Sequence, residues 1–139
     1  MSGGESCRLL CINMLSFIDN PYTNKATINI DKVYSLTYES MRLADDLVDL
    51  ELNAVSKIMD IVKNDTYAYD LWKLIFDKGK DGRRVGLEFT ALSDMVAALN
   101  INFCSEKGNK TVEQVCKLMQ SACLDCQVDM AIERGAFND

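Results

Sequence analysis

Hydrophobic and polar positions follow helical spacing over three long stretches of the chain. In the first stretch, Val33, Leu36 and Leu43 begin an apolar series on one helix face, and Asp31 before them suits the N-cap position. In the last stretch, the Thr111 hydroxyl can cap a helix that ends before a glycine. The predicted helices are residues 32 to 63 (one helix or two joined helices), the segment YAYDLWKLIF to about Lys78, and residues from Thr111 to just before Gly135.

Two shorter apolar segments have the length and composition of strands. They are residues 8 to 15 and the segment RVGLEFT at residues 84 to 90. The glycine-bearing segment Gly82-Arg83-Arg84, with Gly86 after it, lacks the lysine and glycine spacing of a phosphate loop, so it favours a turn that enters the second strand.

The strands are too few for a complete sheet. A short helix at residues 93 to 100 follows the second strand, and the segment FCSEKGN is expected to be a loop. The pattern therefore predicts a mainly α fold with two or so short strands, taken from a larger sheet or barrel whose other strands lie elsewhere. We interpret residues 1 to 139 as a single partial domain with no internal linker.

Composition narrows the class of protein. The 139 residues carry a net charge of −6 and no block of lysine and arginine, so we expect no nucleic-acid partner. No apolar stretch approaches the ~20 residues that span a bilayer, and the start MSGGESCR does not resemble a signal peptide. A cytoplasmic protein with reduced thiols and no membrane partner is the expectation.

The chain contains no histidine, which excludes an imidazole-based catalytic triad and the commonest zinc and haem ligand sets. An acidic cluster on the first predicted helix raises the question of a carboxylate metal site. It consists of Asp45, Asp46, Asp49 and Glu51. Without a histidine partner, this cluster favours a solvated acidic face, and we predict no metal site.

Six cysteines are the remaining candidates for chemistry. Cys116, Cys123 and Cys126 lie on the apolar stripe of the last helix, which favours core packing over a redox or zinc site. Cys104 lies in the expected loop. Cys7 and Cys11 share one face of the first strand, and their spacing leaves both core packing and a redox-active thiol open.

Four motifs occur in a fixed order along the chain: SCRLLCINMLSFIDNP, YESMRLADDLVDLELNAV, GRRVGLEFTALSDMVAAL and MAIERGAF. Together they resemble the large catalytic subunit of ribonucleotide reductase over nearly the whole chain. The resemblance is closest to the adenosylcobalamin-dependent (class II) branch, in which a CRLL strand followed by asparagine and an RLxDDxxDLE helix occur together.

The resemblance implies a ten-stranded α/β barrel, a finger-loop cysteine that becomes a thiyl radical, and two further cysteines that form a disulfide as the ribonucleotide is reduced. Cys7 is implied as one member of that redox pair, and Asn13 as a polar scaffold near the site. The role of Cys11 stays open. The other redox cysteine, the phosphate-binding segment and the finger loop with its N-x-C-x-E motif are expected to lie outside these residues.

We therefore predict part of a ribonucleotide reductase catalytic subunit, which carries one redox cysteine and is inactive by itself. Its implied partners are the remaining parts of that subunit, the ribonucleotide, and adenosylcobalamin in the complete enzyme; we expect no cofactor to bind this chain alone. The alternative is a non-catalytic helical subunit or interaction module derived from the same fold. Apolar strands and helix faces without neighbours also predict a homo-oligomer.

Overall fold

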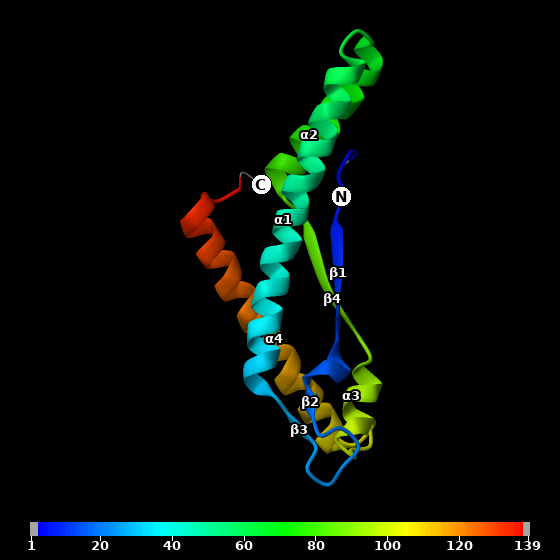
Figure 1. Ribbon diagram of the computed structural model, residues 1–139, viewed down its shortest axis with the longest axis vertical. Coiled ribbons are helices and arrows are strands. Elements are labelled where there is room, and N and C mark those ends of the chain that lie inside the picture. Colours follow the sequence, from blue (N-terminus) through cyan, green and yellow to red (C-terminus); the bar gives the residue numbers. More distant parts are fainter. Residues whose placement is uncertain (1–2, 138–139) are drawn as a thin grey trace.

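The computed structural model describes residues 3–137 and shows an elongated molecule in which long helices run beside a pair of strands (Figure 1). In chain order the elements are β1 (Arg8–Asn13), η1 (Met14–Phe17), β2 (Ile18–Asp19), β3 (Thr27–Ile28), α1 (Ile30–Val62), α2 (Thr66–Gly82), β4 (Val85–Thr90), α3 (Leu92–Ala98) and α4 (Glu106–Arg134). None of the helices in this described part is long and apolar enough to cross a bilayer.

The two predicted strands pair with each other. β1 and β4 run parallel, in a register that places Arg8 beside Val85 and Asn13 beside Thr90. The short strands β2 and β3 form a separate antiparallel pair. Since each sheet of residues 3–137 has two strands, the barrel is not closed within this part of the chain. The mainly helical architecture fits a piece of a barrel domain.

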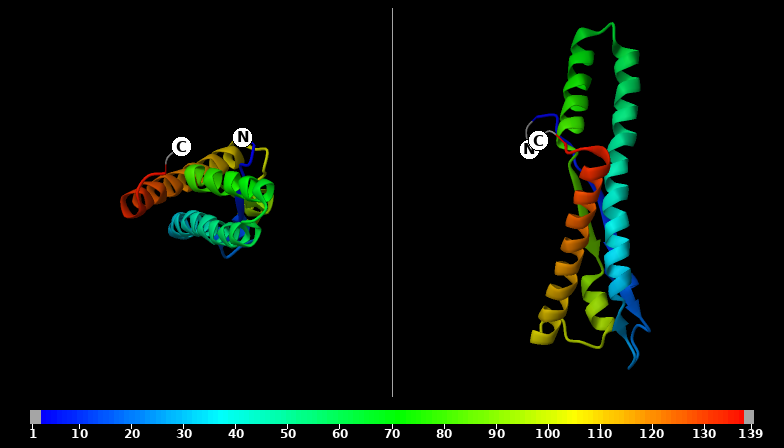
Figure 2. Two further views of the ribbon diagram at one scale, coloured as in Figure 1. Left: turned by 90° about the horizontal axis from the view of Figure 1, so that it is seen from above. Right: turned by 90° about the vertical axis from the view of Figure 1, so that its left-hand side faces the viewer.

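Helices cover one face of the β1–β4 pair. α1 contacts both strands, and β4 side chains pack against Met41 of α1 and Cys126 of α4. The two helices run side by side along the molecule (Figures 1 and 2). Below them, the larger core closes around the fully buried Phe17 of η1, Met95 of α3 and Val115 of α4. The strands are thus held from one side.

The first predicted helix is a single helix, and its cap differs from the prediction. The Asn29 side chain accepts a hydrogen bond from the Lys32 amide at 3.0 Å, so Asn29 and not Asp31 is the N-cap of α1. α2 continues to Gly82, a few residues beyond the predicted end near Lys78. Arg83 then adopts a left-handed conformation with φ +38°, which confirms the predicted turn into the second strand.

The last helix begins five residues earlier than predicted, so the expected loop FCSEKGN is partly wrong. The Ser105 hydroxyl accepts a hydrogen bond from the Gly108 amide at 3.0 Å and caps α4. Gly108 is required there, because a Cβ atom would lie 2.5 Å from the Asn102 carbonyl oxygen. Thr111 lies inside the helix and donates to the Lys107 carbonyl at 2.8 Å.

Candidate functional site

The open face of the sheet carries the residues that sequence analysis singled out on β1. Side chains alternate along this strand, and those opposite the helices are the exposed ones. Leu9 is 64% exposed, and Cys11 and Asn13 are also exposed, whereas Ile12 on the covered face is 5% exposed. Cys7 lies just before β1, in phase with this open face.

Cys7 lies close to the start of β4. It is half-buried, and its Sγ lies 3.9 Å from the Arg8 carbonyl oxygen, which accepts a weak S–H hydrogen bond. A Cβ atom on Gly86 would lie 3.6 Å from Cys7 Sγ and 2.7 Å from the end of the Leu9 side chain. The absence of a side chain on Gly86 therefore leaves room for Leu9, while the distance to Cys7 is that of an ordinary contact.

Asn13 occupies the other end of β1. Its side-chain oxygen accepts a hydrogen bond from the Leu15 amide at 3.0 Å and caps η1. Asn13 is six residue steps of about 3.3 Å each from Cys7, so the two lie roughly 20 Å apart along one face. The structure places both residues on the open face and does not bring their side chains together.

Cys11 is exposed, between Cys7 and Asn13 along the strand and beside Glu88 of β4. The spacing left core packing and a redox-active thiol open for Cys11, and its exposed side chain does not support core packing within residues 3–137. The reason is that the helices pack on the other face of β1, so the face that carries Cys11 has no covering layer among residues 3–137.

The three cysteines of α4, which were predicted to pack in the core, are buried to different extents. Cys126 is fully buried against Met41, and Cys116 and Cys123 are half-buried. Burial raises the pKa of the Cys123 and Cys126 thiols above the usual value, which disfavours the reactive thiolate. These three thiols have the surroundings of structural cysteines.

The expectation that no N-x-C-x-E spacing lies in these residues also needs correction, because Asn102-Phe103-Cys104-Ser105-Glu106 has that spacing. Here the residues form the turn before α4. The Asn102 carboxamide oxygen accepts from the Cys104 amide at 3.1 Å, and Ser105 caps the helix. This turn lies at the end of the molecule that holds β2, β3 and α3 (Figure 1), whereas Cys7 precedes the far end of β1, so the turn and that thiol form no common site within residues 3–137.

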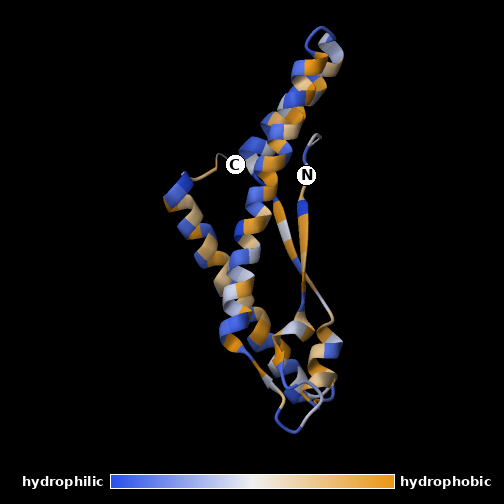
Figure 3. Ribbon diagram, in the orientation of Figure 1, coloured by the Kyte–Doolittle hydropathy of each residue, from blue (hydrophilic) through white to orange (hydrophobic). Residues whose placement is uncertain are grey.

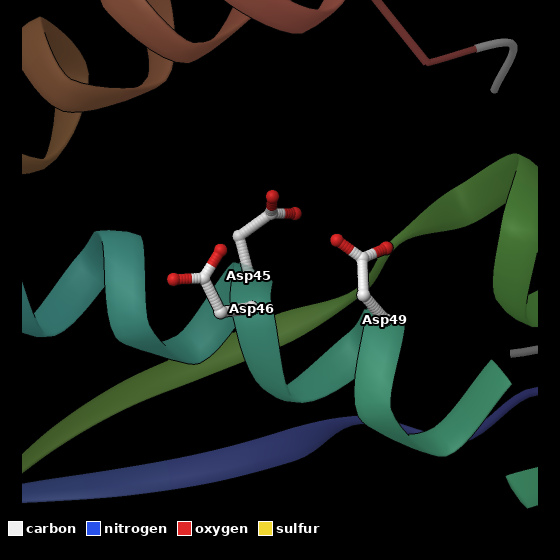
Figure 4. A group of neighbouring side chains, drawn as sticks. All are labelled: Asp45, Asp46 and Asp49. Atoms are coloured by element: carbon white, nitrogen blue, oxygen red, sulfur yellow. The ribbon is translucent and has the colours of Figure 1, made fainter. Parts of the chain in front are cut away.

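The acidic cluster is paired with arginines. Figure 4 shows the carboxylates of Asp45, Asp46 and Asp49 on neighbouring turns of α1. One oxygen from each lies within 4.8 Å of the other two. Asp45 is 8% exposed, so the predicted solvated acidic face is wrong for this residue, whereas the Asp46 and Asp49 side chains are 49% and 53% exposed. Glu51, the fourth acidic residue of the cluster, forms a salt bridge with Arg8.

Two arginines from other elements bind these carboxylates. Arg83 Nε lies 2.7 Å from one Asp45 oxygen, and Arg134 lies 2.6 Å from the other. The same arginines reach Asp49 and Asp46, each at 2.8 Å. The positive charge that a metal would supply already comes from these two side chains, and the hydrogen bond to Asp45 raises the pKa of Arg83 further.

This network joins the end of α2 and the end of α4 to the middle of α1, beside an open hollow of about 580 Å³. Sequence analysis missed it. The available signal was that Asp45 and Asp49 recur at an interval of four residues, while the arginines lie in the GRR and ER segments of two other motifs. In the structure these ion pairs connect α1, α2 and α4.

Comparison with known proteins gives one family. A family model described as "Ribonucleotide reductase, barrel domain" matches residues 2–139. The comparison with curated proteins finds no match.

Proposed function

This chain belongs to the ribonucleotide reductase barrel-domain family, and from that membership we propose that it supplies one redox thiol, Cys7, to the reduction of ribonucleotides. The family match over residues 2–139 is the observation that carries the proposal. The CRLL motif, in which the resemblance gives the cysteine its redox role, begins at Cys7.

In the proposed reaction, a thiyl radical removes the 3′ hydrogen of the ribose and returns a hydrogen at the end. The 2′ hydroxyl leaves as water after it gains a proton. Two thiols lose two protons and two electrons and become a disulfide, which balances the reduction of the C2′ carbon. Cys7 is one of these thiols; the second thiol and the radical cysteine come from other parts of the enzyme.

The position of Cys7 supports this role. In α/β barrels the helices form the outer layer, and side chains on the other face of the strands point inward. α1 and α4 cover one face of the β1–β4 pair, so the face that carries Leu9 and Cys11, with Cys7 in phase, corresponds to the barrel interior. Asn13, at the carboxyl end of the same strand, serves as a polar scaffold by fixing the turn into η1.

The proposed partners are the remaining parts of the catalytic subunit. Parallel strands are found in sheets that are covered on both faces, and β1 and β4 make a parallel pair with one covered face. We propose that further barrel strands pair with the outer edges of β1 and β4. Their side chains then enclose Leu9 and Cys11 and bring the second redox cysteine to Cys7.

Adenosylcobalamin belongs to the finer proposal of a class II enzyme. The hollow beside Arg83, at about 580 Å³, is in the range of a drug-sized ligand and is smaller than a corrin with its adenosyl group requires. We therefore propose that the cofactor site needs further parts of the complete enzyme. Weak or undetectable binding of adenosylcobalamin to this chain stays a prediction.

The experiment is reconstitution with a polypeptide that carries the finger loop and the second redox cysteine. With a small dithiol as reductant, Cys7→Ser is expected to abolish repeated turnover, because one of the two electron-donating thiols is lost. Cys11→Ser is the matched control on the same strand and face. The 139-residue chain by itself is expected to reduce no ribonucleotide. If Cys7→Ser turns over as fast as Cys11→Ser, the redox assignment is wrong.

A further inference from the structure

α2 carries a stripe of exposed apolar side chains. Tyr67 is 84% exposed, Leu71 48% and Leu74 44%. Their intervals of four and three residues place them on one side of the helix. The lower end of the stripe approaches the N-terminal segment, because a Cβ atom on Gly4 would lie 3.2 Å from Leu74 Cγ.

The stripe lies on a part of the molecule that extends away from the sheet. The α1–α2 hairpin rises beyond the strands and beyond the end of α4 (Figures 1 and 2). Apolar and polar residues alternate along this hairpin up to its tip (Figure 3). A partner that reaches the tip must therefore approach the hairpin itself and not the open face of β1.

The spacing of the stripe residues is the same when it is counted from either end of the helix. With Lys78 included, the intervals are four, three and four residues. An antiparallel copy of the helix therefore places Leu71 of each chain on Leu74 of the other. Tyr67 then meets Lys78, whose aliphatic stem can pack on the ring while the ammonium stays in water.

The charges beside the stripe also select an antiparallel copy. Asp70 and Lys73 are exposed and lie on the same flank of α2. In an antiparallel pair, Asp70 of each chain comes close to Lys73 of the other, which gives two attractive pairs. In a parallel twofold pair the flank that carries both residues in one chain meets the other flank of its partner, so neither attractive pair forms.

From the stripe and these charges we propose that α2 is a homodimerisation surface: it pairs antiparallel with α2 of a second copy of this chain about a twofold axis. The two copies present the same residues to each other, as a twofold interface requires. The inference does not depend on the redox role of Cys7, since it rests on α2 alone.

The first test is sedimentation of the 139-residue chain over a wide range of concentration. We expect a concentration-dependent dimer, which Leu71→Glu abolishes because two charges enter the centre of the interface. Leu124→Glu is the matched control, because Leu124 is 54% exposed on α4 and lies outside the surface. A monomer at every concentration, or equal loss of the dimer in both variants, overturns the proposal.

The second test uses the charges. Asp70→Lys and Lys73→Asp each turn both cross-pairs repulsive, so each variant is expected to dimerise about tenfold more weakly than the original chain. An equal mixture of the two variants restores attraction in both cross-pairs, and its dimer should return to the original strength. Lys73 also pairs with Asp77 in its own chain at 2.7 Å, so circular dichroism checks that each helix is intact. Failure of the mixture to recover the dimer overturns the antiparallel arrangement.

Discussion

The two faces of the β1–β4 pair differ in the side chains that cover them. On the covered face, Ile12 and Leu87 pack against residues of the buried core that α1, α3 and α4 supply. On the open face, Leu9 and Cys11 are exposed, and Gly86 adds no side chain. The covered face packs against helices of this chain, whereas the open face has no covering layer among residues 3–137. In the proposed function, the open face is one wall of a site that other parts of the enzyme complete. Stability and proposed chemistry are therefore separated across one sheet.

Thiol labelling compares the two faces most directly, and it has the largest expected effect. Cys11 and Cys104 are exposed and should react first, followed by the half-buried Cys7. The Cys126 thiol is buried and has a raised pKa, so it reacts only when the structure opens locally. Its alkylation rate should therefore be lower than that of Cys11 by a factor on the order of a hundred or more. Mass spectrometry of the chain at increasing times of alkylation gives the order. Equal rates for Cys126 and Cys11 would show that the covered face is not packed.

A pair of truncations compares the faces through stability. Phe17→Ala removes a fully buried ring from the core and should lower the free energy of unfolding by about 3–4 kcal/mol. Leu9→Ala, on the open face, should lower it by less than about 0.5 kcal/mol. Urea unfolding at low protein concentration measures both values. A large cost for Leu9→Ala would mean that something covers the open face in solution.

The aspartate–arginine network stabilises the covered side. Asp45→Ala leaves Arg83 and Arg134 without their shared carboxylate and should cost about 2–3 kcal/mol. Asp49→Ala is the control, since Asp49 is 53% exposed and binds one arginine, and it should cost less than about 1 kcal/mol. Both are read from urea unfolding. Similar costs for the two variants would mean that burial of Asp45 adds nothing.

Helical periodicity predicted most of the long elements because each helix has one continuous apolar side. The two strands were also predictable, as short apolar segments between polar ones. The start of α4 was not, because the Ser105 cap and the close approach of Gly108 to Asn102 depend on the preceding turn. The small pair β2 and β3 has two residues in each strand, which is too short for a pattern.

The candidate site was predictable only in part, because it depends on which face the helices cover. The sequence places Cys7 and Cys11 on one side of a strand, but apolar neighbours on both sides gave no sign that this side is open. Likewise, the carboxylates on α1 were visible as a cluster, while their arginines come from distant segments. Contacts between remote segments require the fold.

A buried hydroxyl on the covered side offers a smaller test. Thr37 of α1 is fully buried, and its hydroxyl oxygen has no hydrogen-bond partner within residues 3–137. Thr37→Val keeps the shape and removes the unsatisfied group, so it should raise the free energy of unfolding by about 1 kcal/mol. Thr111→Val is the control, since it loses a hydrogen bond to the Lys107 carbonyl and should not stabilise. Urea unfolding of both variants measures the difference, and a loss of stability in Thr37→Val contradicts this account.

The smallest expected effect concerns the polar seam between α1 and α4, which is the row of side-chain hydrogen bonds Tyr34–Asp125, Tyr38–Asp129 and Arg42–Glu133. The Tyr38 hydroxyl donates to Asp129 at 2.8 Å, and this hydrogen bond, with burial and the negative charge of Asp129, raises the pKa of Tyr38 to about 12. In the unfolded chain a tyrosine loses its proton near pH 10, so the stabilisation is complete below about pH 10 and is lost between about pH 10 and 12. Urea unfolding should show a steeper loss of stability over this range in the original chain than in Tyr38→Phe. The neighbouring Tyr34 is present in both proteins, so its own titration cancels in the comparison. Identical pH profiles would mean that the Tyr38 hydrogen bond does not hold the seam.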